Sequence, residues 1–115
     1  MTITLYGISN CDTVKKARAW LTANGSGFTF HDYGRLGLPD GALERWSDAV
    51  GWESLLNRRG TTWRRLDAAQ QAGAVDAAGA NALMQAHPSL IKRPVVEWDD
   101  GTVTVGFDAI LWAAR

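Results

Sequence analysis

The first third of the chain combines two short apolar runs with one amphipathic stretch between them. Residues 3–6 are apolar at alternate positions and precede a glycine, which predicts a short strand. A helical stripe of apolar residues follows, formed by Val14, Ala17 and Leu21. The pair Asn24-Gly25 predicts the end of this helix, and residues 28–33 alternate like a second strand. A strand, a helix and a strand in this order predict a right-handed βαβ unit with parallel strands.

The middle of the chain, residues 39–87, has helical rather than strand periodicity. Residues 34–40 are expected to form a loop. The next helix is predicted from an apolar stripe formed by Leu43, Trp46 and Val50. A short helix is expected over residues 52–56, whereas residues 68–74 have only a weak pattern. A last helix is predicted over residues 76–87, because an aspartate opens it and a proline follows it.

The last third returns to strands. Residues 94–98 predict one strand and residues 102–105 predict its partner, because the Asp-Asp-Gly sequence at 99–101 favours a tight turn. Residues 107–114 predict a closing helix, with Asp108 near its start. The order βαβ, helices, ββα predicts an α/β protein with a thioredoxin-like fold and a central all-helical insertion.

Length and composition are those of one globular domain. The chain has 115 residues, 46% of them hydrophobic, and we expect a single domain over residues 1–115. Residues 1–34 and 88–115 would form its α/β frame, and residues 39–87 its helical insertion. Lys plus Arg and Asp plus Glu are equal at 12 each, which argues against nucleic acid or an anionic membrane as a partner. No apolar run approaches the roughly 20 residues that span a bilayer, and no secretion signal is visible.

Cys11 is the only cysteine and the leading candidate for a reactive group. Asn10 is the expected N-cap, which places Cys11 in the first helical turn, where free backbone N–H groups favour a thiolate. Lys15 lies one turn further along the same face and would favour the thiolate too, whereas Asp12 would oppose it. The alternative is an inert buried cysteine, the usual state of a lone cysteine. The position between a strand and a helix favours the reactive interpretation.

No second cysteine is present to resolve an oxidised Cys11, because Val14 stands where a Cys-x-x-Cys motif would have one. A disulfide or sulfenate on Cys11 must therefore be resolved by another molecule, such as glutathione or a partner protein. One cysteine also permits no internal disulfide, which fits a reducing, cytoplasmic setting. His31 and His87 lack the spacing of metal ligands, so no metal site is predicted.

Two basic segments are candidates for holding an anionic substrate. In a thioredoxin-like frame the segment before Pro94 faces the cysteine loop, so Arg93 would hold an oxyanion or a carboxylate by paired hydrogen bonds. The alternative is a solvated basic pair before a trans proline, and the sequence leaves the isomer of this bond open. The second segment, residues 55–65, contains four arginines, of which Arg58 is the favoured anion ligand. The alternative there is a solvated helix end.

The chain resembles the arsenate reductase (ArsC) family, and within it the YffB-like, Spx-related branch. The stretches that carry the resemblance are Tyr6–Arg18, His31–Tyr33, Leu56–Arg64 and His87–Val95. The resemblance implies a thioredoxin fold with a helical insertion. In the arsenate reductases of this family a cysteine attacks arsenate, three arginines hold the oxyanion, and glutathione and glutaredoxin complete the reduction. The resemblance thus implies that Cys11 is the nucleophile and that Arg93 is the arginine before a cis proline.

The same resemblance places Asn57 and Gly106 where the other two arginines of the family stand, with Arg58 beside Asn57. Each charged hydrogen bond contributes about 1.5–3 kcal/mol, so the loss of two arginines would weaken arsenate binding by orders of magnitude. Arg58 would restore part of this loss if it took the place of the second arginine.

The leading hypothesis is a cytoplasmic, monothiol reductase with Cys11 as its nucleophile and glutathione as a co-substrate, and with no tightly bound cofactor. The residues expected to bind the substrate or glutathione are Lys15, Asn57, Arg58, Arg93 and Pro94. One alternative is an arsenate reductase that works with glutathione and glutaredoxin. Another is a transcription regulator that binds RNA polymerase in the manner of Spx, although Val14 removes the Cys-x-x-Cys switch that many of those proteins carry.

Overall fold

The computed structural model describes residues 2–115. By its internal contacts the chain divides into two units, and each is described separately below. We call Met1–Gly37 together with Arg93–Arg115 the α/β unit, and Leu38–Lys92 the helical unit. Within the described residues, every helix is too short or too polar to cross a lipid bilayer.

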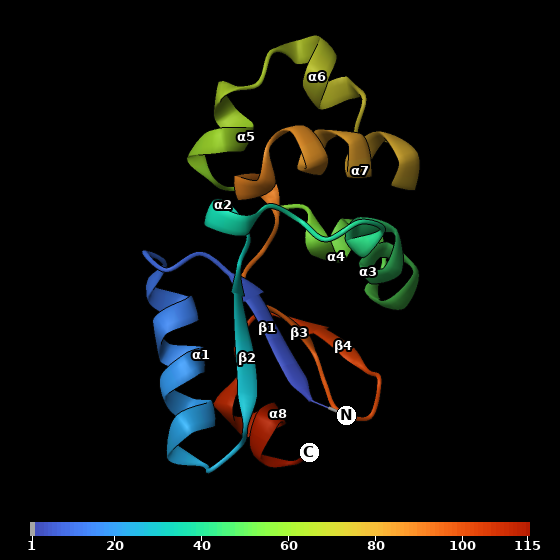
Figure 1. Ribbon diagram of the computed structural model, residues 1–115. Coiled ribbons are helices and arrows are strands. Elements are labelled where there is room, and N and C mark those ends of the chain that lie inside the picture. The colour runs from blue at the N-terminus through green and yellow to red at the C-terminus, as the bar shows by residue number, and fades with distance from the viewer. Residues whose placement is uncertain (1) are drawn as a thin grey trace. The chain divides into compact units, whose positions relative to one another are not determined.

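The α/β unit is built on a four-stranded sheet with the order β2-β1-β3-β4. Its strands are β1 (Ile3–Gly7), β2 (Phe28–Asp32), β3 (Val95–Glu97) and β4 (Val103–Val105). β1 and β2 are parallel and joined by helix α1 (Asp12–Ala23), whereas β3 is antiparallel to both β1 and β4 (Figure 1). The predicted βαβ unit and the predicted hairpin before the last helix, α8 (Ala109–Ala113), are both present. The thioredoxin-like fold expected from the sequence is therefore confirmed.

Helices α1 and α8 pack on the same face of the sheet and bury one apolar cluster. The cluster contains Ile3, Leu5, Val14, Ala17, Leu21, Val96, Trp98 and Trp112. Trp112, on α8, is 4% exposed and packs edge-to-face with the rings of Trp20, Trp98 and Phe107. Because one ring contacts three others, α8 is held to the sheet mainly through this indole.

The helical unit contains more helices than the sequence pattern predicted. Its elements are α3 (Ala42–Val50), α4 (Trp52–Leu55), α5 (Thr61–Arg65), α6 (Ala68–Ala72), α7 (Ala77–Ala86) and the 3₁₀ helix η1 (Pro88–Leu90). The sequence pattern did not predict α5. Residues 68–74, where the pattern was weak, contain α6. A capping box starts α6, in which Asp67 accepts from the backbone of Gln70 and the Gln70 side chain accepts from the backbone of Asp67.

The loop expected over residues 34–40 is also partly helical. A single helical turn, α2 (Tyr33–Leu36), begins where β2 ends, and the carboxylate of Asp32 accepts from the backbone N–H of Gly34. The expectation that the second strand continues through Tyr33 is wrong for the same reason. The aspartate cap draws the backbone out of the strand one residue earlier than the apolar pattern indicated.

The packing of Trp112 generates a prediction for stability. Trp112→Ala removes a buried indole and its three ring contacts, so we expect the free energy of unfolding to fall by about 3–5 kcal/mol. The control is Leu111→Ala on the same helix, because Leu111 is 66% exposed and should change stability little. Urea unfolding curves of both variants measure the difference, and equal midpoints for the two would contradict this role of Trp112.

Candidate active site

The turn from β1 into α1 is unusually tight because Gly7 has no side chain. A Cβ atom at Gly7 would lie 2.7 Å from Cγ2 of Val14, which is a clash. The two methyl groups of Val14 therefore occupy the space that a side chain at position 7 would need. This packing holds the first turn of α1 against the end of β1. Cys11 lies in the four-residue connection between the two elements.

Cys11 is itself the N-cap of α1, with φ −96° and ψ 124°. Its carbonyl accepts the first hydrogen bond of the helix from the N–H of Lys15, at 3.0 Å. The expectation that Asn10 is the cap and that Cys11 lies inside the first turn is therefore wrong by one residue. The consequence for the chemistry is favourable, because the side chain of an N-cap residue faces the free N–H groups of the helix.

The pKa of the Cys11 thiol is lowered from its ordinary value. Partial burial against the core is the largest effect and raises this pKa, but it is outweighed by several stabilising groups. The N–H groups of Val14 and Thr13 and the guanidinium of Arg93 stabilise the negative sulfur. The sulfur makes no cap hydrogen bond of standard geometry, so the N–H groups act on it mainly as dipoles. The net result is a half-buried sulfur that favours the thiolate.

Arg93 lies beside the sulfur because of the register of the sheet. β3 runs antiparallel to β1 with Val95 opposite Tyr6, so the residues before Val95 lie next to the chain as it leaves β1. The Arg93-Pro94 peptide bond is cis, and the Pro94 carbonyl accepts from the N–H of Gly106 at 2.8 Å. Burial lowers the pKa of Arg93, whereas its interactions with Cys11 and Tyr33 raise this pKa by a larger amount. The pKa is therefore raised overall, and the guanidinium stays charged.

Tyr33 is a member of this cluster that the sequence analysis did not single out. Its side chain is 2% exposed, and its buried hydroxyl makes no hydrogen bond of standard geometry within residues 2–115. It nevertheless lies close enough to Arg93 for each to act on the pKa of the other. Burial raises the pKa of Tyr33, which keeps the phenol neutral.

The position of Tyr33 could have been read from the topology. β1 and β2 are parallel, with Gly7 opposite Asp32, so the residues that follow the two strands emerge at the same edge of the sheet. Cys11 follows the first strand and Tyr33 follows the second. A polar side chain at the carboxyl end of a predicted parallel strand was the signal that was missed.

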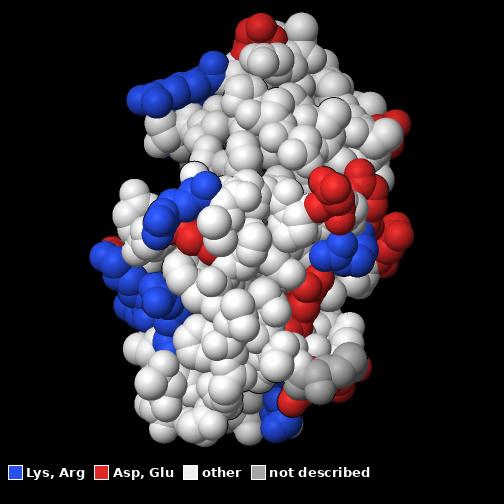
Figure 2. Space-filling model, viewed as in Figure 1, with Lys and Arg blue, Asp and Glu red and all other residues white. Residues whose placement is uncertain are grey.

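Basic side chains surround the start of α1. Figure 2 shows Lys and Arg side chains gathered over this helix, where Lys15 and Lys16 are exposed and Arg18 stacks on the ring of Phe30 at 4.1 Å. Lys15 is not among the groups that lower the pKa of Cys11 most. Its position instead suits attraction of an anionic substrate toward the sulfur.

The other predicted ligands, Asn57 and Arg58, belong to the helical unit. There they line a hollow of about 390 Å³ together with Glu53, Leu56, Arg59 and Lys92. Asn57 accepts from the N–H of Arg59 at 3.0 Å. Arg58 donates to the carbonyl of Ala74 at 3.3 Å and lies over the ring of Trp52. Their role in binding substrate stays a prediction.

Gly106, in the α/β unit, has a positive φ of 86° that favours glycine over arginine.

Comparison with known proteins shows the family. Residues 6–114 match the model of the ArsC family. The chain belongs to the ArsC family. A protein of Haemophilus influenzae described only as uncharacterized is 42% identical over 106 residues, which are 92% of this chain and 91% of that protein.

Solved structures place this ArsC-family chain in the YffB-like branch. A structure named YFFB (PA3664) protein is 50% identical, with a TM-score of 0.92 over 98% of this chain and 97% of that one. An arsenate reductase related protein from Brucella melitensis is also 50% identical, with a TM-score of 0.76 over 100% of this chain and 94% of that one. An arsenate reductase from Vibrio cholerae is 19% identical with a TM-score of 0.79, covering 99% of this chain and 97% of that one, and this likeness concerns the fold alone.

The contact between Arg93 and Cys11 predicts a change in thiol acidity. Arg93→Gln removes a positive charge that stabilises the thiolate, so the pKa of Cys11 should rise, by roughly 1 unit or more. The rate of alkylation by iodoacetamide, measured across pH, reports this pKa. Lys16→Gln, which removes an exposed charge of α1, is the control. An alkylation midpoint that Arg93→Gln leaves in place would show that Arg93 does not act on the sulfur.

Proposed function

We propose that this ArsC-family chain is a single-cysteine thiol reductase that uses glutathione as its reductant. The observation that carries the proposal is the thiolate of Cys11, which the start of α1 and Arg93 stabilise together. Cys11 is the only cysteine in the sequence, so the second thiol of the reaction comes from another molecule. Glutathione supplies such a thiol in a reducing, cytoplasmic compartment, which is where we expect the protein to work.

The proposed reaction has two balanced steps. In the first, the Cys11 thiolate attacks the glutathionyl sulfur of a mixed disulfide, so that a Cys11–glutathione disulfide forms and the substrate sulfur leaves as a thiolate that takes a proton from water. In the second, the thiolate of another glutathione attacks the glutathionyl sulfur on Cys11. Oxidised glutathione leaves and the Cys11 thiolate is restored. In the net reaction the mixed disulfide and one glutathione become the substrate thiol and oxidised glutathione.

A lowered thiol pKa assists both steps. It raises the fraction of Cys11 that is ready to attack at neutral pH, and it makes the same sulfur a better leaving group in the second step. The positive charge of Arg93 next to the sulfur favours an anionic substrate, because glutathione carries carboxylates that a guanidinium can bind by two hydrogen bonds. In this proposal Lys15, Asn57 and Arg58 are further candidates for the carboxylates.

Arsenate reduction is the second candidate, and one observation favours it. A guanidinium beside a nucleophilic thiolate is suited to holding an oxyanion during attack. However, Asn57 and Gly106 supply no positive charge at the two positions where the family resemblance expects arginines. We therefore place arsenate behind mixed disulfides of glutathione as the substrate. Glutaredoxin would be the partner in that reaction.

A coupled assay tests the leading proposal. The protein should reduce the mixed disulfide of glutathione and 2-mercaptoethanol, measured as NADPH oxidation through glutathione reductase. Cys11→Ser should lower the rate to the uncatalysed background, because no other thiol is present. Lys16→Gln is the matched control and should keep most of the rate, whereas Arg93→Gln should slow the reaction at neutral pH.

Four outcomes would overturn this assignment. Turnover that survives in Cys11→Ser would remove the nucleophile from the mechanism. Mass spectrometry of the folded protein after incubation with oxidised glutathione measures uptake of a glutathionyl group. No uptake would remove glutathione from the mechanism. A faster reaction with arsenate, glutathione and glutaredoxin would put arsenate first. Inactivity in both assays together with capture of RNA polymerase would favour a regulator.

A further inference from the structure

A second hollow lies at the end of the α/β unit that is remote from Cys11. Its volume is about 640 Å³, within the roughly 300–1,000 Å³ that is usual for small-molecule pockets. Ile3, the first residue of β1, lines it, whereas Cys11 follows the last residue of that strand. The two places therefore lie at opposite ends of the central strand, and the proposed reductase reaction does not use this hollow.

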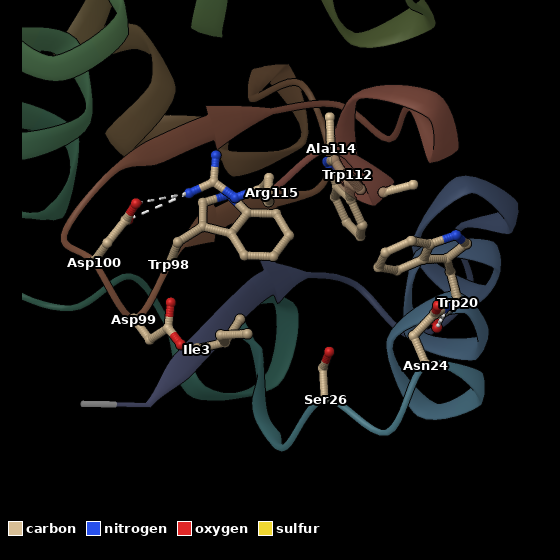
Figure 3. Close-up of a pocket in the computed structure, with 11 residues that line it drawn as sticks. Ile3, Trp20, Asn24, Ser26, Trp98, Asp99, Asp100, Trp112, Ala114 and Arg115 are labelled. Carbon is tan, nitrogen blue, oxygen red and sulfur yellow. Dashed lines mark hydrogen bonds and ion pairs between the residues drawn. The ribbon is translucent and has the colours of Figure 1, made fainter.

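Three indoles form its apolar wall. Trp112 lies between Trp98 and Trp20 in Figure 3, and its ring is nearly perpendicular to both, at 89° and 79°. The ring centroids are 5.0 Å and 5.6 Å apart. Trp20 is half-buried, and its only ring contact within residues 2–115 is the one with Trp112. Part of its surface is therefore open to a ligand.

One face of this wall already holds a cation. The guanidinium carbon of Arg115 lies 4.2 Å from the ring centroid of Trp98. The same guanidinium donates to Asp100 at 3.2 Å (Figure 3). It also donates to the hydroxyl of Thr102 at 2.6 Å. A cation stacked on an indole and neutralised by a carboxylate is the arrangement that proteins use for apolar organic cations. The side chain of Arg115 thus shows which charge these walls stabilise.

The charges that line the hollow leave an excess of one carboxylate. Asp99 and Asp100 stand against the single guanidinium of Arg115. The hydrogen bonds from Thr102, and then the charge of Arg115, hold the pKa of Asp100 below its usual value, so this carboxylate is ionised. Asp99 is exposed and makes no hydrogen bond or ion pair within the part of the chain that the structure describes. Of the two acidic side chains in the lining, it is the one that no described residue already pairs with.

We propose that this hollow binds a small organic cation with an aromatic body, whose ammonium head lies at Asp99 and whose ring packs against the open surface of Trp20, beside Trp112. Indole surface and a free carboxylate each favour such a ligand over the alternatives. An anion of the same size would meet the excess carboxylate. A neutral aromatic molecule would gain the ring contacts but lose the ion pair.

The test uses three probes of similar size and different charge. These are benzyltrimethylammonium, benzyl alcohol and benzoate, each titrated at millimolar concentration into the nitrogen-15-labelled full chain. The indole N–H signals of Trp20 and Trp112 should shift with the cation, and should shift less with the alcohol and the acid. Trp20→Ala should weaken cation binding about two- to tenfold, and Asp99→Asn about two- to fivefold.

Two controls separate this site from the reductase site. Asp40→Asn removes an exposed carboxylate of the helical unit and should leave the affinity for the cation unchanged. The rate of Cys11 alkylation should be the same with and without the bound cation. Equal binding of the cation and the alcohol would overturn the proposal, and so would an Asp99→Asn variant with unchanged affinity. Neither result would affect the assignment of Cys11, just as an inactive reductase assay would not affect this site.

Discussion

The chemistry of this protein depends on the contact between Gly7 and Val14. Because position 7 has no side chain, the methyl groups of Val14 pack directly on the end of β1, and only four residues separate the strand from α1. That short connection makes Cys11 the cap of the helix. The N–H groups of the first helical turn then face the sulfur, and Arg93 reaches it from the segment before β3. The reactive thiolate follows from how closely a helix approaches a strand, with the cysteine at the point where they meet.

Most of the α/β unit could be predicted from the sequence, because β1, α1 and β2 are long enough to show a period and a turn signal marks the hairpin of β3 and β4. The stripe of Val14, Ala17 and Leu21 and the Asp-Asp-Gly turn each have a single structural interpretation. The elements that were missed, α2, α5 and α6, have four or five residues each, which is too short for an apolar stripe. Their signals are local instead. Asp32 and Asp67 cap two of them, and a search for caps would have found both.

The candidate site could be predicted in part. Cys11 could be found from its place between a strand and a helix, whereas Arg93 required the fold, because nothing near it in the sequence points to a thiol more than 80 residues away. Tyr33 was missed because it comes close to Arg93 and Cys11 only when β2 lies next to β1. The one-residue error at the cap has a similar origin. Asn10 has the better capping side chain, but the packing of Val14 determines where the helix starts.

The cysteine and the arginine that activates it belong to the same unit of the chain, whereas Asn57 and Arg58 belong to the other. If Asn57 and Arg58 bind the substrate as proposed, recognition and thiol acidity can change separately in evolution. Substitutions in the helical unit would then alter which molecules are recognised and leave the pKa of Cys11 unchanged. A family built in this way can keep one nucleophile and acquire new substrates, and an asparagine in place of an arginine at position 57, in the helical unit, is the kind of change that such a division permits.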